Sequence, residues 1–141
     1  MPTDSEILRW QQGRTGFRLV PFEDWRALLK TGANVLVTGP EGALTAFVKA
    51  ARAELTAPIV TVGSPDPLQF DAARTVILTD VHTCSAERQQ ELKRWMNEAG
   101  RLRAQVLSLT TEPLLPLVNA HRFDAELYYR LNTIHFEIRG M

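Results

Sequence analysis

Apolar residues follow two different spacings along this chain, and the two spacings predict two kinds of element. Short unbroken apolar runs predict buried strands, whereas apolar residues that recur every three or four positions predict amphipathic helices. Strands are expected at residues 34–38, 58–62, 75–78, 105–109 and 133–139. Helices are expected at residues 21–30, 86–99, 114–119 and 123–131, and another follows the turn at Gly39 and Gly42, with Leu44, Phe47, Val48, Ala51 and Leu55 on its inward face. This alternation of strand and helix predicts an α/β domain with a mainly parallel sheet.

The last predicted strand has a pattern of its own. Ile134, Phe136 and Ile138 alternate with polar residues, whereas an earlier strand such as 75–78 is an apolar run. Strict alternation indicates one buried face and one face in water, so this strand is expected at an edge of the sheet.

Residues 1–20 form a separate polar segment, and residues 21–141 are expected to form one domain. Within the N-terminal segment, Ile7, Leu8 and Trp10 predict the start of a short helix. Because Trp10 lies outside the expected core, its amphipathic ring is a candidate for contact with a partner protein.

Composition and charge exclude several classes of function. The 141 residues include 16 basic and 16 acidic ones, so no net charge attracts anionic lipid or nucleic acid, and direct DNA binding is not expected. Cys84 is the only cysteine, which excludes an intrachain disulfide and fits a reducing compartment. No apolar run reaches membrane-spanning length, and the polar N-terminus is unlike a signal peptide. The chain is therefore expected to be cytoplasmic.

A turn with two glycines, Gly39 and Gly42, joins the first predicted strand of the domain to the following helix. Strand, glycine turn and helix in this order are the layout of a phosphate-binding loop, in which backbone N–H groups at a helix N-terminus hold a polyphosphate. The motif is G-x-x-x-x-G-K-[ST], and from Gly39 its second glycine falls on Leu44 and its lysine on Thr45. The turn therefore keeps the frame of a nucleotide site without its cation.

Three further stretches carry a resemblance to a known family. Residues 122–132, Arg-Phe-Asp-Ala-Glu-Leu-Tyr-Tyr-Arg-Leu-Asn, are similar to the segment G-R-F-R-E-D-L-Y-Y-R-L-N of sigma-54-dependent transcriptional activators, which are AAA+ ATPases that remodel the sigma-54 form of RNA polymerase. Residues 75–81 resemble the Walker B segment T-L-F-L-D-E-I of this family, and residues 105–111 resemble its sensor strand V-I-A-A-T-N. With the glycine turn, the resemblance covers about residues 22–138. It implies a three-layer α/β/α P-loop NTPase-like (AAA+) core with a five-stranded sheet in the order 5-1-4-3-2.

The resemblance also implies which positions carry catalysis in the family. The phosphate-binding lysine falls on Thr45, the Walker B pair keeps one carboxylate, Asp80, and the sensor asparagine falls on Thr111. Of two arginines that reach a neighbour's γ-phosphate, the first falls on Asp124 and the second on Arg130, which is retained. Because phosphoryl transfer depends on positioned charges, we expect neither ATP hydrolysis nor a catalytic residue. The vestigial nucleotide positions are Gly39, Gly42, Thr45 and Asp80.

The chain also lacks parts that the family has. Residues 63–74 are too short for the G-A-F-T-G-A loop that contacts sigma-54, and the sequence holds neither the helical lid nor a C-terminal helix-turn-helix. The resemblance therefore implies a degenerate, truncated AAA+ domain. A fragment of a longer regulator is the alternative.

No metal or other cofactor is expected. His82 and Cys84 form a single His-x-Cys pair, whereas zinc requires four converging ligands.

Arg122 and Arg130 are candidates for a partner interface, and ion pairs with Asp124 and Glu126 are the alternative for them. The predicted function is a non-catalytic protein-interaction module in bacterial transcription regulation, docking on an active AAA+ relative or another regulator, with a homo-oligomer as a further alternative. The alternative function is an ATP-binding regulatory switch without efficient hydrolysis, because helix N-terminal amides alone can hold an anion.

Overall fold

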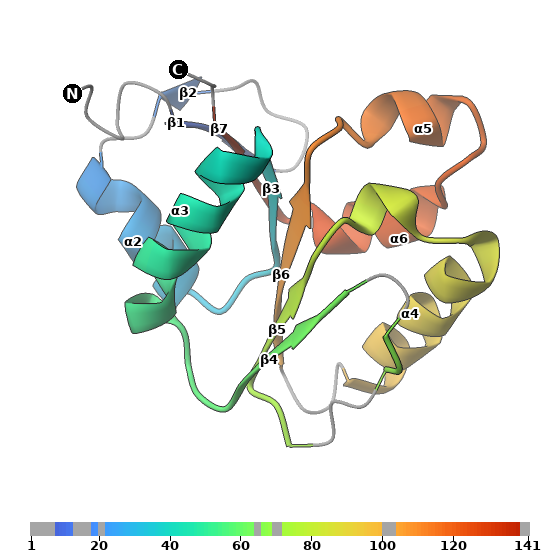
Figure 1. Ribbon diagram of the computed structural model, residues 1–141, viewed down its shortest axis with the longest axis horizontal. Coiled ribbons are helices and arrows are strands. Elements are labelled where there is room, and N and C mark those ends of the chain that lie inside the picture. Colours follow the sequence, from blue (N-terminus) through green and yellow to red (C-terminus); the bar gives the residue numbers. More distant parts are fainter. Residues whose placement is uncertain are drawn as a thin grey trace.

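A computed structural model of the protein describes residues 8–12, 18–19, 22–63, 66–68, 72–99 and 104–138. Its strands (Figure 1) are β1 (Leu8–Gln12), β2 (Arg18–Leu19), β3 (Val35–Thr38), β4 (Ile59–Val62), β5 (Thr75–Leu78), β6 (Gln105–Thr110) and β7 (Ile134–Ile138). Its helices are α2 (Phe22–Lys30), α3 (Glu41–Ala51), α4 (Ala86–Ala99), α5 (Leu115–Asn119) and α6 (Ala125–Leu131). Short 3-10 helices follow α3 at Arg52–Glu54 and precede α4 at Val81–Thr83.

The described strands form one seven-stranded sheet in the order β2-β1-β7-β3-β6-β5-β4. The strands from β7 to β4 are all parallel, and numbered along the domain they stand in the order 5-1-4-3-2. This confirms the predicted sheet. Beside β7, the strands β1 and β2 add an antiparallel extension (Figure 1).

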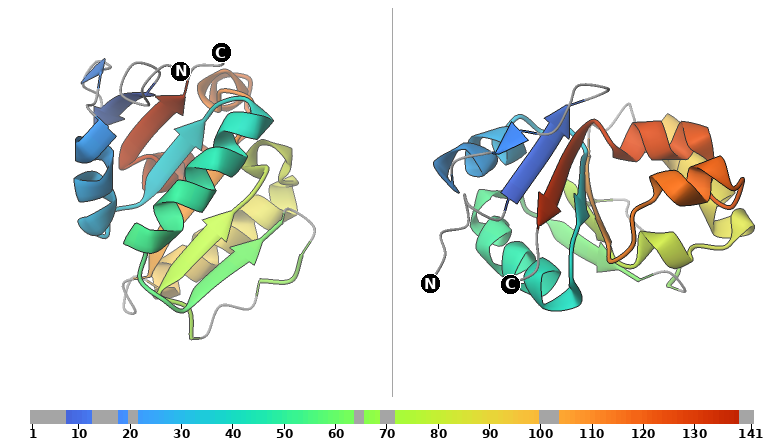
Figure 2. Two further views of the ribbon diagram at one scale, coloured as in Figure 1. Left: turned by 60° about the vertical axis from the view of Figure 1, so that its left-hand side comes forward. Right: turned by 90° about the horizontal axis from the view of Figure 1, so that it is seen from above.

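Helices cover both faces of the sheet, which gives three layers (Figure 2). On the face of α2 and α3, the rings of Trp25 and Phe47 lie 5.1 Å apart within a core that includes Val35 and Val37. Leu36 lies between these two valines and belongs to the opposite core, under α4 and α6, because successive side chains of a strand point to opposite faces. The layered α/β/α arrangement is therefore confirmed.

The edge position expected for the last strand is wrong. β7 lies between β3 and β1, and β1 pairs with it along its whole length, from Leu8 opposite Ile138 to Gln12 opposite Ile134. The polar position His135 is buried, with its Nε2 2.8 Å from the Thr38 hydroxyl. His135, the first of the alternating polar residues, is therefore buried instead of facing water, and Glu137 is half-buried.

The short helix expected in the N-terminal segment is also wrong where the structure describes it. Residues 8–12, which include Leu8 and Trp10, form strand β1, and Ile7 lies outside the described residues. Pairing with β7 satisfies the backbone groups of this short polar stretch, and that long-range partner overrides a weak local helical pattern.

Helix α4 has the predicted bounds and the predicted start. The backbone N–H of Arg88 donates to Ser85 Oγ at 3.1 Å, so Ser85 is the N-cap. Among the described residues, no helix is long and apolar enough to cross a membrane.

Candidate functional site

The turn after β3 is shorter than a phosphate-binding loop. Only Gly39 and Pro40 separate β3 from α3, and the Leu44 N–H already donates to the Pro40 carbonyl at 2.9 Å. The helix thus begins at Glu41, so that Gly42 of the predicted turn lies inside it, and it takes in the residues that would otherwise wrap around phosphate groups. Glu41 also places a carboxylate in the first helical turn, where an anion would have to approach.

The two positions that depart from the motif have opposite environments. Leu44 is 6% exposed and belongs to the core beneath α2 and α3. Thr45 is exposed, and its hydroxyl donates to the Glu41 carbonyl one turn earlier at 3.1 Å. Leu44 therefore acts in packing, and Thr45 satisfies its own helix.

The two glycines of the predicted turn lie in different surroundings. A Cβ on the buried Gly39 would lie 3.0 Å from the Ile138 carbonyl oxygen and 3.1 Å from the Ile138 Cβ. A Cβ on Gly42, in the first turn of α3, would meet no atom within 4 Å. Close approach of β7 requires Gly39, whereas no contact of the described residues requires Gly42.

We therefore expect opposite results from two alanine substitutions in this turn. Gly42→Ala should raise the free energy of unfolding by up to about 1 kcal/mol, because alanine is the better helix former. Gly39→Ala should lower it by about 1–3 kcal/mol, because the new methyl group overpacks against β7. Chemical denaturation followed by circular dichroism measures both, and destabilisation by Gly42→Ala would contradict the open space at that position.

The Walker B and sensor positions lie at the same end of the sheet as Gly39. The Gly39 N–H donates to the carbonyl of Thr110 at 3.2 Å, which places the ends of β3 and β6 side by side. Thr111 follows β6, and its hydroxyl lies 3.3 Å from Nε2 of His82, a residue that follows Asp80 closely in the chain. Gly39, Asp80 and Thr111 therefore lie near one another, because the carboxyl ends of parallel strands meet at the same end of a sheet.

Asp80 has a left-handed backbone, with φ 53° and ψ 43°, a conformation that aspartate tolerates better than most residues. Its carbonyl accepts hydrogen bonds from the backbone N–H of Thr83 at 2.9 Å and from the Thr83 hydroxyl at 2.7 Å. These bonds close the turn into α4, while the Asp80 side chain is exposed. Of the Walker B pair, this end of the sheet thus keeps only Asp80, and it has no lysine at the position where the motif requires it.

Asp124, at the position of the first family arginine, joins helix α6 to helix α4. Its Oδ1 accepts from the Leu127 N–H at 2.9 Å, which makes Asp124 the N-cap of α6. Its Oδ2 lies 3.2 Å from Lys93 Nζ and 3.3 Å from Gln90 Nε2, and its own N–H donates to Gln89 Oε1 at 2.7 Å. We call these five residues the Asp124 clamp. The sequence indicated a reversed charge at Asp124 and an ion pair with an arginine as its alternative role, but not the N-cap, although an aspartate directly before a helix is a usual N-cap signal.

Burial and hydrogen bonding act in opposite directions on the Asp124 carboxyl. Burial raises its pKa, but the hydrogen bonds from the Leu127 N–H, Lys93 and Gln90 outweigh burial, so the pKa is lowered. The hydrogen bond with Asp124 in turn raises the pKa of Lys93. Asp124 therefore stabilises the fold above its unfolded pKa of about 3.9, and this contribution is lost as the pH falls through the lower folded value.

Removal of the clamp should have a moderate effect on stability. Asp124→Ala should lower the free energy of unfolding by about 1–2 kcal/mol at neutral pH, because the helix loses its cap. Glu126→Ala is the matched control, since Glu126 also lies 3.3 Å from Lys93 but caps nothing, and it should change stability by less than about 0.5 kcal/mol. Equal losses in the two variants, measured by urea denaturation, would contradict the capping role.

The predicted partner-interface residues lie on three different elements. Arg122 is exposed just before α6, and its carbonyl accepts from Gln89 Nε2 at 3.2 Å. Arg130 is exposed in the last turn of α6, with its Nε 4.0 Å from Glu126 Oε1. Trp10 lies in β1, opposite Phe136 of β7. The two arginines thus mark opposite ends of α6, and their role as an interface stays a prediction.

The His82 and Cys84 pair gains no further ligand in the described part of the chain. Cys84 is buried, and His82 contacts Thr111. Among the described residues, no group of three or more histidine, cysteine or acidic side chains could hold a metal ion.

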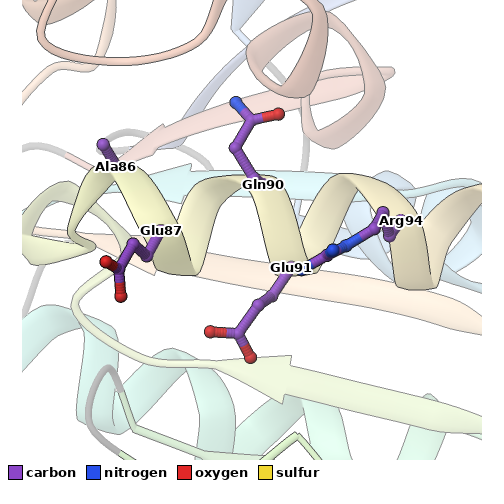
Figure 3. A pocket seen from close by; sticks show the side chains of 5 residues that line it. All are labelled: Ala86, Glu87, Gln90, Glu91 and Arg94. Carbon is purple, nitrogen blue, oxygen red and sulfur yellow. The ribbon is translucent and has the colours of Figure 1, made fainter.

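The outer face of α4 lines a shallow depression of the surface (Figure 3), formed by Ala86, Glu87, Gln90, Glu91 and Arg94. Gln90 points away from Glu87 and Glu91 in this view, and it belongs to the Asp124 clamp through its Nε2, which donates to Asp124 Oδ2. The rest of the depression is an exposed helix face of mixed charge, which provides no converging set of groups for chemistry.

The sheet order and the helix layers define a P-loop AAA+ fold, and comparison with known proteins agrees. NtrX from Brucella abortus in complex with ADP superposes with a TM-score of 0.65 at 19% identity, over 87% of this chain and 37% of that chain. AMPPCP-bound DnaA from Aquifex aeolicus superposes with a TM-score of 0.62 at 15% identity, over 86% of this chain and 48% of that chain. This chain therefore spans less than half the length of either protein.

The family is established by sequence. The model of the Sigma-54 interaction domain matches residues 25–141, and the chain belongs to this family. No curated protein matches the chain. β1 and β2 precede the matched residues.

Proposed function

We propose that this chain is a non-catalytic protein-interaction module related to sigma-54 transcriptional activators and that it acts in bacterial transcription regulation. The observation that carries the proposal is the turn after β3, where α3 begins at Glu41 and Leu44 fills the core. A phosphate-binding loop with a lysine could form here only if the start of α3 and the packing of Leu44 were both lost.

Other positions support the same proposal. Asp80 has no second carboxylate beside it in sequence, and Asp124 caps α6 where the family has an arginine. Phosphoryl transfer needs a cation on the phosphates, a metal ligand, a group that orients the nucleophile and a charge from a neighbour. Most of these charges are replaced here, while the residues that pack the fold are kept.

Nucleotide binding and turnover provide the first test. NtrX, whose structures are described with ADP and with ATP, serves as the positive control for binding. We expect ATP with magnesium to leave the melting temperature of this chain unchanged, because a ligand of the folded state alone must raise it. A raised melting temperature without turnover would support the ATP-binding switch instead, and turnover would overturn the proposal.

Binding to an active AAA+ relative provides the second test. Arg122 and Arg130 are exposed at the two ends of α6 and are offered as the contact surface. Calorimetry with the AAA+ domain of a sigma-54 activator should give binding that Arg122→Ala and Arg130→Ala each weaken about tenfold. Lys49→Ala, an exposed change on α3 across the sheet, is the control and should leave affinity unchanged.

A further inference from the structure

A cleft of about 330 Å³ lies where the first turns of α4 meet the loop between α5 and α6. We call it the α4–α6 cleft. Ala86, Gln89 and Gln90 line it from α4, and Val118 lines it from α5. Its remaining wall is formed by residues 121–125, which lead into α6. Three separate segments of the chain thus meet around one hollow.

Hydrogen bonds hold the loop wall of this cleft in place. The side chain of Gln89 is buried, and its Nε2 donates to the Arg122 carbonyl at 3.2 Å and to the Cys84 carbonyl at 3.0 Å. Its Oε1 accepts from the Asp124 N–H at 2.7 Å. On the other side of the loop, the Arg122 N–H donates to the Leu117 carbonyl at 2.8 Å. The cleft therefore has its shape without a ligand, which lowers the entropic cost of binding one.

Two basic side chains, His121 and Arg122, line the cleft. Both are exposed, and neither forms an ion pair with a described residue. The Asp124 carboxylate already accepts hydrogen bonds within the Asp124 clamp, from a backbone N–H, an ammonium group and an amide. Glu126 lies 3.3 Å from Lys93 of the same clamp. The charge that remains available to a ligand is therefore positive.

The acidic residues on the outer face of α4 do not cancel this charge. Figure 3 shows Glu87 and Glu91 pointing away from Gln90, which is the residue of this face that also lines the cleft. The cleft also lies beside the N-terminus of α4, where the helix dipole favours an anion. An anionic ligand is thus the one that the cleft matches in charge.

The backbone of His121 is left-handed, with φ 59°. Glycine adopts this conformation at no steric cost, and the family segment G-R-F-R-E-D-L-Y-Y-R-L-N has glycine at the position before its first arginine. The histidine side chain is exposed, so packing of the fold does not explain its presence. A backbone conformation with a cost, at a residue that packs against nothing buried, indicates a role in binding.

We propose that the α4–α6 cleft binds an acidic segment of a partner protein, with Arg122 and His121 contacting its carboxylates. The proposal rests on the function proposed above, because it names the chemistry that the same surface recognises. A carboxylate suits this site because the planar guanidinium of arginine binds it through two parallel hydrogen bonds. Nucleic acid does not suit it, since the chain has no net positive charge. The half-buried Val118 adds an apolar contact for a residue beside the carboxylates.

Fluorescence anisotropy of a labelled peptide of glutamate and leucine, titrated with the full chain, tests the proposal. We expect the peptide to bind and its affinity to fall with added salt, because salt screens exposed charges. The same peptide with glutamine in place of glutamate should not bind. Absence of binding by the glutamate peptide, or equal binding by the glutamine peptide, would overturn the proposal. So would displacement of the glutamate peptide by a single-stranded oligonucleotide, because the cleft would then accept any anion.

Substitutions in the cleft identify the site. Arg122→Ala should weaken the peptide about tenfold, and Arg122→Lys should weaken it less, because lysine keeps the charge without the paired hydrogen bonds. Arg94→Ala is the matched control, an exposed arginine on the outer face of α4, and it should leave the affinity unchanged. An equal loss in this control would overturn the proposal.

His121→Gly separates binding from folding. It should weaken the peptide, but the melting temperature should not fall, because glycine fits the left-handed backbone. Unchanged affinity in both His121→Gly and Arg122→Ala would overturn the proposal.

The calorimetry with the AAA+ domain of a sigma-54 activator separates this inference from the proposed function. Binding to that domain that Arg122→Ala weakens, without any binding of the glutamate peptide, would overturn the acidic segment and leave the function in place. Binding of the peptide that depends on Arg122, without binding to the AAA+ domain, would support the acidic segment and exclude that domain as the partner.

Discussion

Leu44→Ala should lower the free energy of unfolding by about 2–5 kcal/mol. Leu44 is 6% exposed and lies in one core with Phe47 of the same helix and Trp25 of α2. Truncation removes buried apolar surface and leaves a cavity between α3 and the sheet, because a packed core relaxes only partly. Urea denaturation followed by circular dichroism gives the free energy by linear extrapolation.

The neighbouring residue supplies the control for this prediction. Thr45→Ala lies on the same turn of α3 but on its exposed side, where the hydroxyl donates to the carbonyl of Glu41. It should change stability by no more than about 0.5 kcal/mol. Similar small losses in both variants would mean that Leu44 does not fill the core, and the main support for a non-catalytic role would be removed.

Acid should destabilise this protein through His135. Burial lowers the pKa of His135 from 6.5 to about 4. Between these two values the unfolded chain binds a proton that the folded chain does not, so stability falls as the pH drops from about 6.5 towards about 4. The full loss is about 3 kcal/mol, because one pKa unit corresponds to about 1.4 kcal/mol.

A pair of histidine variants isolates this effect. His135→Gln keeps a polar partner for Thr38 but cannot take up the proton, so the fall in stability between pH 6.5 and pH 4 should become shallower by most of that amount. His121→Gln, at an exposed position, should retain the full pH dependence. If His135→Gln kept the same dependence, burial of a neutral imidazole would not be its source.

The elements with strong local signals could be predicted from sequence. Helix α4 and strand β5 have the predicted bounds, because Ser85 caps the helix and Thr79-Asp80 interrupts the apolar run after the strand. The sheet order came from resemblance to a family, because spacing alone predicts parallel strands without their order. It was confirmed by the pairing of β3 with both β6 and β7.

The neighbours of β7 could not be predicted in this way. Alternation of apolar and polar residues indicates that the two faces of a strand differ, but it does not indicate what covers the polar face. In β7 the polar residue His135 faces a buried layer, and the strand beside it comes from residues 8–12, more than a hundred positions earlier in the chain.

The candidate site shows the same limit. The motif register predicted that Leu44 and Thr45 replace the glycine and lysine, but it predicted neither that α3 starts at Glu41 nor that Gly39 lies close to Ile138. The contact of Asp124 with helix α4 is made by Lys93, which lies 31 positions away in the chain. Sequence reasoning identified what was replaced, and the fold was needed to find what the replacements do.

The pairing of β1 with β7 has a consequence for solubility. A strand at the edge of a sheet presents a row of unpaired N–H and C=O groups that can recruit another chain and start aggregation. Here that row belongs to β7, whose Ile134, Phe136 and Ile138 are strongly apolar, and β1 covers it completely. The family match begins at residue 25, after β1. A variant shortened to the matched residues would therefore expose the unpaired backbone groups of β7, and we expect it to aggregate more readily than the chain that includes β1.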